Sequence, residues 1–456
     1  MANPTLRSYG SLPQHLRFMA AQVWYDLRNG LLFRPFLWTA TLSCLAMGLP
    51  WLESQPGVEP WLQAQLSGWV LGEPGSAQLL LTTIASAMMT TVSVVYSVLV
   101  VALSLASVQF SPRVLGQFLR AQTSQNTVGW FVGTFVYCLL VLRTVRVTEP
   151  VFVPVLAVGL ALGLALVALS LLIYALHDLA TSLQANHIVN RIATETLPVL
   201  DEVLGDPKAA KPVHDVACTK ADMPMGGYPV QSDRSGYLQL LDENELITVA
   251  QQTGALICVP VLEGEFVLEG DVIATIHGKE APDDALVRAV AGAFDLGPLR
   301  TLQRDAEFGF RQIVDVALKA ISPAVNDPST ACTCIDQLAR LLTHAVRRPL
   351  HEPWARDAHG QQRLWLRRLD TTELIDLAFN QLRQYGAGDM AVALRLVRTM
   401  AAVHVAAVRA DDKARVLHHA GLLAERTLAS FGAGDCAELH RRLGQLGLQP
   451  PSNQTH

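Results

Sequence analysis

The chain has 456 residues, of which 50% are hydrophobic and only 16% charged, and its formal net charge is −5 at pH 7. Soluble globular chains carry about 25% charged residues, so this composition excludes an ordinary, wholly soluble domain. The charges of the first 176 residues leave a small positive excess, whereas the rest of the chain is acidic and lacks the basic footprint that nucleic-acid binding requires.

Residues 1–30 form a polar lead in which Leu16, Met19, Val23 and Leu27 share one helical face. This pattern predicts a cytoplasmic or interfacial segment with an amphipathic helix lying on the membrane surface. No small-residue cleavage site follows the first apolar run, so the lead does not resemble a signal peptide.

Four uncharged stretches follow, at residues 35–52, 74–112, 121–142 and 150–177. A helix needs roughly 20 apolar residues to cross the hydrocarbon core of a bilayer. The first stretch is short, but Leu31, Leu32 and Phe33 extend it. The sequence therefore predicts a four-helix transmembrane domain over residues 31–177.

The placement of arginine predicts the orientation of these spans, because positive charge favours the cytoplasmic side. The arginines of the membrane half are Arg7, Arg17, Arg28 and Arg34 before the first span, Arg113 and Arg120 after the second, and Arg143 and Arg146 after the third. The loop between the first two spans has no Lys or Arg, and only the last pair favours the opposite orientation. The balance predicts that both termini are cytoplasmic.

The second span carries small hydroxyl residues at helical spacing. Thr83, Thr90, Ser97 and Ser104 are seven residues apart, and further serines follow the same period with an offset of three. Spacings of three and four place them on one helix face. This stripe either packs against another membrane helix or lines a wetted path, and we take Thr83, Thr90, Ser97 and Ser104 as pore-lining candidates. No charged residue lies in the span, which disfavours a proton relay.

Residues 178–226 continue the apolar stripe of the fourth span and then become rich in Pro, Gly, Ala and Lys, which predicts a connector helix followed by a linker. Residues 227–280 change to short runs of Val, Ile, Leu and Tyr between Gly, Asp and Asn, which predicts a small all-β domain. Its "LEGEFVLEGDVIATI" resembles the barrel-sandwich layout of biotinyl and lipoyl domains. Because no Lys lies between Lys220 and Lys279, we expect no attached biotin or lipoate and a structural or assembly role.

Residues 281–456 predict a helical cytoplasmic domain, and "RDAEFGFRQIVDVALKAISPAVNDPSTA" is its most distinctive part. Asp327 before Pro328 is a good N-cap and first-turn pair for the following helix. Asp305, Arg311 and Asp315 could form a paired cluster beside it. The candidate cytoplasmic motif is Asp305, Arg311, Asp315, Asn326 and Asp327. It would supply buried caps and ion pairs, or else bind a ligand or ion.

No nucleophile, metal motif or phosphate-binding loop accompanies these residues, so we expect no enzyme, metal or cofactor. The seven cysteines are scattered, and Cys332 and Cys334 are too close for the usual zinc-knuckle spacing. The absence of a disulfide framework indicates a reducing compartment for the soluble half.

The motif just quoted and "VVYSVLVVALSLASVQFSPRVLGQFL" together resemble the bacterial predicted membrane proteins catalogued as domain of unknown function 2254. The resemblance covers most of the chain and implies a multi-pass protein of the bacterial inner membrane. It implies no activity and no catalytic residues.

The sequence thus predicts an α-helical integral membrane protein with four transmembrane helices and a cytoplasmic region made of a small all-β unit and a helical domain. The leading hypothesis is a homo-oligomeric channel or conduit, lined by the second span and opening into a cytoplasmic vestibule. This layout is similar in outline to small-conductance mechanosensitive channels. A membrane-tethered scaffold or regulator that binds a protein through the helical domain is the alternative, and an enzyme acting on lipid or envelope precursors is a third class.

Overall fold

The computed structural model describes residues 33–55, 73–109, 122–148, 151–182, 184–205, 224, 226–432 and 436–445. The chain divides into two compact units, Met1–Gln184 and Ala185–His456, here called unit 1 and unit 2. The predicted interfacial segment over residues 1–30 and nearly all of the predicted linker after residue 205 lie outside the described residues.

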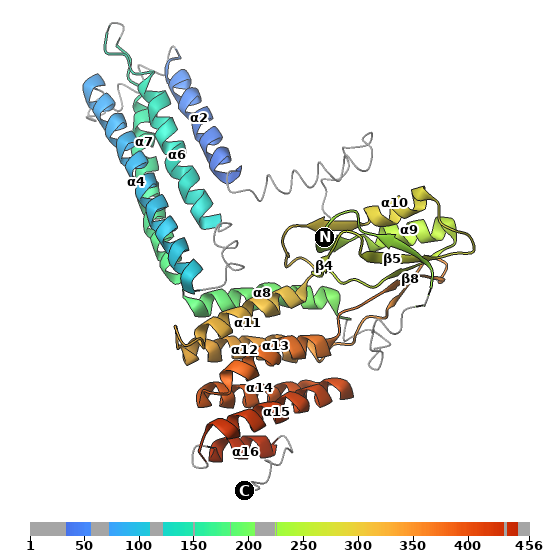
Figure 1. Cartoon of the computed structure of the whole chain (residues 1–456). Helices are drawn as coiled ribbons and strands as arrows, with labels where there is room; N and C mark the ends of the chain where they lie inside the picture. Colours follow the sequence, from blue (N-terminus) through green and yellow to red (C-terminus); the bar gives the residue numbers. More distant parts are fainter. Residues whose placement is uncertain are drawn as a thin grey trace. The chain divides into compact units, whose positions relative to one another are not determined.

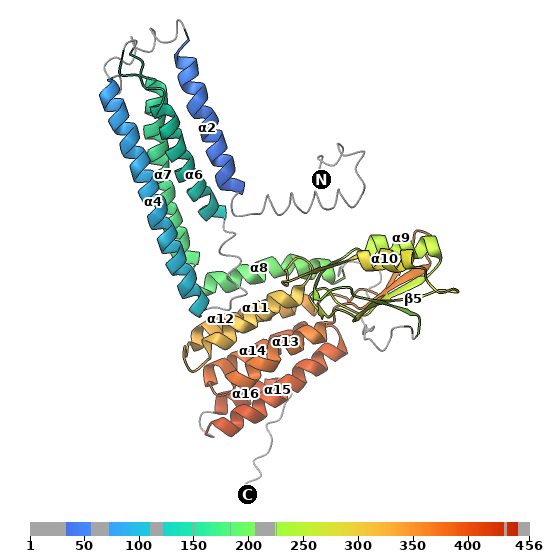
Figure 2. The same cartoon turned by 45° about the horizontal axis from the view of Figure 1, so that its top comes forward.

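Unit 1 contains the four predicted spans as helices that run side by side (Figures 1 and 2). They are α2 (Phe33–Glu53), α4 (Pro74–Gln109), α6 (Gln122–Leu142) and α7 (Val155–Ser182). All four are long and apolar enough to cross a membrane, which confirms the prediction of four candidate spans. Helix α4 has 36 residues and is therefore about 54 Å long, well beyond a hydrocarbon core of about 30 Å.

Two glycines one turn apart let α6 approach α2 closely. A Cβ at Gly129 would lie 2.7 Å from the Cα of Pro35, and one at Gly133 would lie 2.8 Å from a methyl carbon of Leu42. Small residues four apart are a common means of helix packing in membranes, where shape complementarity replaces the hydrophobic effect. The ring of Trp38 meets Trp130 edge-on beside these glycines, with ring centroids 5.0 Å apart.

Polar side chains hold α7 against its neighbours. Glu53, the last residue of α2, is 3% exposed and accepts hydrogen bonds from the backbone N–H groups of Leu156 (3.1 Å) and Ala157 (2.9 Å). The hydroxyl of Tyr137 donates to the carbonyl oxygen of Ala157 at 2.9 Å. The carboxylate of Glu53 therefore caps the N-terminus of α7, whose first N–H groups have no partner within the helix.

Unit 2 contains a layered helical part and an α/β part (Figures 1 and 2). The helical part consists of α8 (Ala185–Val203), α11 (Ala306–Ala320), α12 (Pro328–Ala345), α13 (Thr371–Gly386), α14 (Met390–Ala406), α15 (Ala410–Ser430) and α16 (Ala437–Gln445). At Gly309 of α11 a Cβ would lie 2.0 Å from the hydroxyl oxygen of Thr196 on α8, so only glycine permits this helix contact.

The predicted connector differs from what the structure shows. The fourth span ends at Ser182, and α8 begins as a separate helix at Ala185. Helix α8 is amphipathic and buries Ile188, Ile192 and Leu200. It contacts α11 and α12, so it belongs to the helical part of unit 2 and is not the predicted rigid continuation of the fourth span.

The α/β part has two sheets. A five-stranded sheet has the order β1 (Tyr228–Gln231), β5 (Val272–His277), β3 (Leu256–Val259), β8 (Gln362–Leu366) and β7 (Trp354–Arg356). A three-stranded sheet has the order β4 (Phe266–Val267), β2 (Gly236–Leu241) and β6 (Phe294–Gly297). Strands β3 and β8 pair in parallel, and all other pairs are antiparallel. Strands β7 and β8 thus come from a segment predicted to lie in the helical domain.

The predicted region of short strands over residues 227–280 is present, but it is not all-β. Helix α9 (Glu243–Thr253) lies within it, α10 (Asp284–Gly292) follows directly after it, and both contact the five-stranded sheet. Helix α9 buries Leu246, Val249 and Ala250 on one face and is capped by the side chain of Asp242, which accepts from the N–H of Glu245 at 3.0 Å. This Asp-x-x-Glu start, followed by spacings of three and four, was the local signal for a helix.

Candidate functional site

The hydroxyl stripe of α4 lies on the face of the helix that points away from the core of unit 1. Thr83, Thr90, Ser97 and Ser104 are exposed. The buried face is formed by Ala77, Leu81, Ile84, Ala85, Met88 and Val92, which pack in the core with α2, α6 and α7. Met88 and Ser97 are nine residues apart, which corresponds to about 180° around an α-helix. Within the described residues the stripe therefore does not pack inside this chain.

The hydroxyl groups of the stripe bond to their own helix. Thr83, Thr90 and Ser97 each donate to the backbone carbonyl oxygen four residues earlier, at 2.7, 2.9 and 2.8 Å. Each oxygen retains lone pairs that can accept a further hydrogen bond. The stripe can therefore be wetted or packed without an unsatisfied donor.

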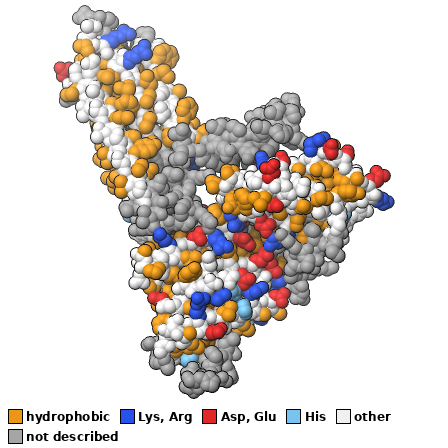
Figure 3. Space-filling view, viewed as in Figure 1, with side chains coloured by type: hydrophobic (Ala, Val, Ile, Leu, Met, Phe, Trp, Pro, Cys, Tyr) orange, Lys and Arg blue, Asp and Glu red, His pale blue; other side chains and the backbone are white. Residues whose placement is uncertain are grey.

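The exposed face of α7 has a different character. Its large exposed side chains are Leu156, Leu162, Leu166, Val167, Leu169, Ile173, Tyr174 and Leu176. These are mostly the branched apolar residues that hydrocarbon tails favour. On the face drawn in Figure 3, apolar side chains are spread along the membrane helices, and the visible charged side chains lie near their upper end. Of the two long exposed spans, α4 and α7, α4 therefore carries a row of hydroxyl residues on its described exposed face and α7 does not.

A second candidate site, here called the junction cavity, lies in unit 2 between the α/β part and the helical part. It has a volume of about 220 Å³ and is lined by the end of α8, the start of α9, the loop before β4, the start of α11 and the segment after β8. Its lining holds five carboxylates but only three guanidinium groups, together with His351. Figure 3 shows acidic and basic side chains gathered in a band on one face of unit 2.

The guanidinium groups of the cavity are all engaged by carboxylates. Arg368 binds Glu243 with two hydrogen bonds of 2.8 and 3.1 Å. Arg304 lies 3.1 Å from Glu202 at the end of α8, 3.4 Å from Glu263 and 3.9 Å from Glu243. These ion pairs join α8, α9, the β3–β4 loop and the start of α11.

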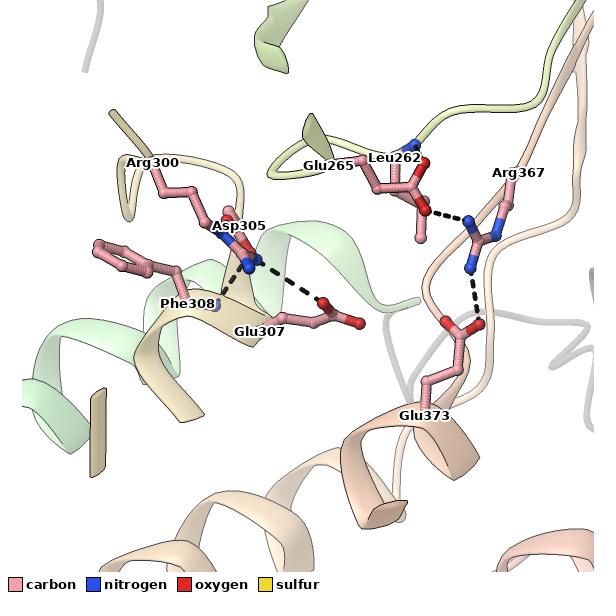
Figure 4. A network of polar contacts seen from close by, with 8 residues as sticks. All are labelled: Leu262, Glu265, Arg300, Asp305, Glu307, Phe308, Arg367 and Glu373. Atoms are coloured by element: carbon pink, nitrogen blue, oxygen red, sulfur yellow. Dashed lines mark hydrogen bonds and ion pairs between the residues drawn. The ribbon is translucent and has the colours of Figure 1, made fainter. Parts of the chain in front are cut away.

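Arg367 adds a further bridge between the two parts of unit 2 (Figure 4). It follows β8, forms an ion pair with Glu265 beside β4 and donates to Glu373 in the first turn of α13 at 2.8 Å. Its backbone N–H also donates to the carbonyl oxygen of Val259 in β3 at 3.0 Å. Sheet and helices are therefore connected by charged side chains at several points around the cavity.

Asp305 of the predicted motif lies at this cavity, but its partner is Arg300 and not Arg311. Arg300 donates to the two carboxylate oxygens at 2.7 and 2.8 Å, and Asp305 also caps α11 by accepting from the N–H of Phe308 at 3.0 Å (Figure 4). Gly264 makes room for this pair, because a Cβ there would lie 2.1 Å from an Asp305 oxygen. The predicted Asp305–Arg311–Asp315 cluster is thus wrong for Asp305, and Arg311 instead reaches Gln381 at 3.3 Å.

The other end of the motif is an N-cap, as predicted. Asp327 accepts from the N–H of Thr330 at 3.1 Å and from its hydroxyl at 2.6 Å, with Pro328 in the first turn of α12. These hydrogen bonds lower the pKa of Asp327. Asn326 adopts a left-handed backbone with φ of 50°, which asparagine tolerates better than most residues. Helix α11 has 15 residues, so Asp305 and Asp327 lie at opposite ends of about 22 Å of helix and do not converge.

Burial and surplus negative charge shift the acids of the junction cavity. Burial raises the pKa of Glu263 to about 6, and the attraction of Arg304 only partly opposes it. Burial and the charge of Asp305 raise the pKa of Glu307. For Glu243, the hydrogen bonds and charge of Arg368 outweigh burial and lower the pKa. The network was not visible in the sequence, because its members come from five segments with no local spacing in common.

The chemistry of the junction cavity is that of ion pairing and proton binding. Among the described residues, no group of three or more His, Cys, Asp or Glu side chains is arranged to hold a metal ion. The pairs instead fix how the α/β part and the helical part of unit 2 are joined.

Comparison with known proteins places the chain in a family. The family described as predicted membrane protein (DUF2254) matches residues 28–402. Uncharacterized proteins of Mycobacterium bovis and Mycobacterium tuberculosis are each 30% identical over 338 residues, which is 73% of this chain and 64% of theirs. The matched region therefore spans less than two thirds of the length of these relatives. No solved structure gives a significant match. With four apolar spans and a family match over most of its length, the chain belongs to the DUF2254 family of predicted membrane proteins.

Proposed function

We propose that the protein is a homo-oligomeric channel or conduit of the bacterial inner membrane, with α4 facing the shared path and unit 2 forming a cytoplasmic vestibule. Both termini would lie in the cytoplasm. We keep the expectation that the protein is not an enzyme, which rests on sequence motifs alone.

The observation that carries the proposal is the contrast between the exposed faces of α4 and α7. Positions facing lipid favour large apolar side chains, as on α7. The exposed face of α4 also carries large apolar side chains, but it adds a row of Ser and Thr from Thr83 to Ser104, about six turns of helix, opposite its buried face. Hydroxyl groups that still accept hydrogen bonds suit a water-filled path formed by several copies.

Substitution of Ser97 tests this proposal. In a conduit, Ser97→Leu should leave the oligomer intact and reduce conductance at least tenfold, because a ring of apolar side chains dewets a narrow path. Ser97→Asp should make the conductance selective for cations. The measurements are oligomer size in detergent and conductance in planar bilayers under voltage and tension. Val98→Leu is the matched control, since Val98 is exposed about 100° away around the helix.

Two outcomes would contradict the conduit. One is a wild-type protein that never conducts. The other is dissociation of the oligomer by both Ser97 variants, which would indicate a packed interface in place of a path.

A membrane-tethered scaffold is the second candidate function. It would replace the conduit proposal if either of these two outcomes were observed. The observation that favours it is the exposure of large apolar side chains on the helical part of unit 2. Val405 at the end of α14 is 83% exposed and Tyr385 at the end of α13 is 68% exposed. A scaffold would bind its protein partner there, and Val405→Asp would weaken binding without changing the membrane unit.

A further inference from the structure

The junction cavity contains more negative charge than its arginines neutralise. Arg368 is held by Glu243 with two hydrogen bonds, and Arg300 is held in the same way by Asp305. Among the described residues, the Glu307 carboxylate lies 3.7 Å from Arg300 and is also attracted by the charge of Arg367. It therefore lines the cavity beside a guanidinium group that Asp305 already holds.

Glu263 is a largely buried acid of this cavity whose arginine partner is shared with other carboxylates. Its side chain is 17% exposed, and one oxygen accepts from the backbone N–H of Leu241 at 3.1 Å and lies 3.4 Å from Arg304. The titratable and charged groups that surround it on the packed elements are Glu202, Glu243, Arg304, Asp305, Glu307, His351, Arg367 and Arg368. The charge of Glu243 repels a charged Glu263, while Arg304, Arg368 and the N–H of Leu241 attract it. Arg304 is shared with Glu202 and Glu243, so it neutralises Glu263 only in part.

We propose that the junction cavity is a proton-sensitive clasp: uptake of one proton at Glu263 removes surplus negative charge and tightens the contact between the α/β part and the helical part of unit 2. The contact is looser at alkaline pH, when all five carboxylates are charged. This inference concerns unit 2 alone and does not rest on the proposed conduit.

The direction of the effect follows from linkage between protonation and structure. The pKa of Glu263 is about 6 in the closed structure and about 4.5 in an opened, solvated one. The closed state therefore binds the proton more tightly, and the stabilisation is complete below pH 4.5 and is lost as the pH rises through 6. His351 acts in the opposite direction, because burial and Arg368 lower its pKa and its protonation disfavours the closed state.

Hydrogen–deuterium exchange of the full-length protein in detergent measures the opening of the clasp. The reporters are the backbone amides of Leu241, bonded to Glu263, and Gly264, bonded to the carbonyl oxygen of Leu238 at 2.7 Å. After correction for intrinsic exchange, the change from pH 7.5 to pH 5.5 should raise protection about fourfold through Glu263. The experiment is repeated in a His351→Gln background, where protonation of His351 can no longer oppose the effect of Glu263.

Glu263→Gln mimics the protonated side chain, so in the His351→Gln background its protection at pH 7.5 should exceed the value without the Glu263 substitution at pH 5.5, and its protection should lose most of the pH dependence. Glu269→Gln, an exposed substitution in the β4–β5 turn, should retain the wild-type response. Glu307→Gln is the second variant and should raise protection at pH 7.5, since it removes surplus charge from the cavity. The proposal is overturned if Glu263→Gln keeps the wild-type pH response, or if acid lowers protection in the His351→Gln background.

Discussion

Individual carboxylates have distinct roles according to what surrounds them. Glu53 is buried at the end of a membrane span, where two backbone N–H groups of α7 and the positive end of its dipole stabilise the charge. Asp305 and Asp327 cap helices in unit 2. The sequence predicted the cap at Asp327 because Pro328 follows it. The capping role of Glu53 could not be predicted, because its partners lie more than 100 residues away in the sequence.

Replacing Glu53 should destabilise unit 1. Glu53→Gln loses the negative charge and leaves one of the two N–H groups, of Leu156 or Ala157, facing amide hydrogens, so we expect a loss of about 2 kcal/mol in the free energy of unfolding. Titration of the purified protein from mild detergent into sodium dodecyl sulfate measures this loss. Glu73→Gln is the control, because Glu73 is exposed and its side chain accepts only from the hydroxyl of Ser76. An equal loss in both variants would show that Glu53 is not a specific cap.

Among whole elements, the helices of unit 1 could be predicted more fully than the α/β part of unit 2. Long apolar stretches predict membrane helices by length alone. The strands of unit 2 pair across large sequence separations, and β3 pairs in parallel with β8 although about 100 residues lie between them. Such long-range pairing produces no local sequence pattern. The role of Gly129 and Gly133 on α6 is likewise recognised only when their contacts with α2 are known.

Two glycines of unit 1, one on α6 and one on α7, should respond differently to substitution. Gly129→Ala places a methyl group 2.7 Å from the Pro35 backbone, so α2 and α6 must separate, at a cost of about 1–3 kcal/mol. Gly163→Ala on α7 should be neutral or stabilising, because no atom lies within 4 Å of its Cβ and alanine favours the helix. The comparison uses the same detergent titration on both variants. A loss at Gly163 as large as that at Gly129 would contradict the assigned α2–α6 contact.

At the scale of the whole molecule, composition predicted a membrane half and an acidic soluble half, and the structure divides near that point into two units. The candidate sites were predicted less completely. The α4 stripe follows from periodicity within one helix, whereas the junction network needs five segments brought together by the fold. Function depends on which side of the membrane unit 2 occupies, and only the arginine distribution addresses that question.

The orientation of the chain is the last prediction. The loop after α2 carries no Lys or Arg up to residue 77, so it should lie outside the cytoplasm, and unit 2 should lie inside. In a cysteine-free background, a membrane-impermeant maleimide applied to intact cells should label Ser54→Cys and not Ser235→Cys; both positions are exposed. Permeabilised cells should label both, which controls for reactivity. Labelling of Ser235→Cys in intact cells would place the α/β part outside, and a cytoplasmic vestibule would then be impossible.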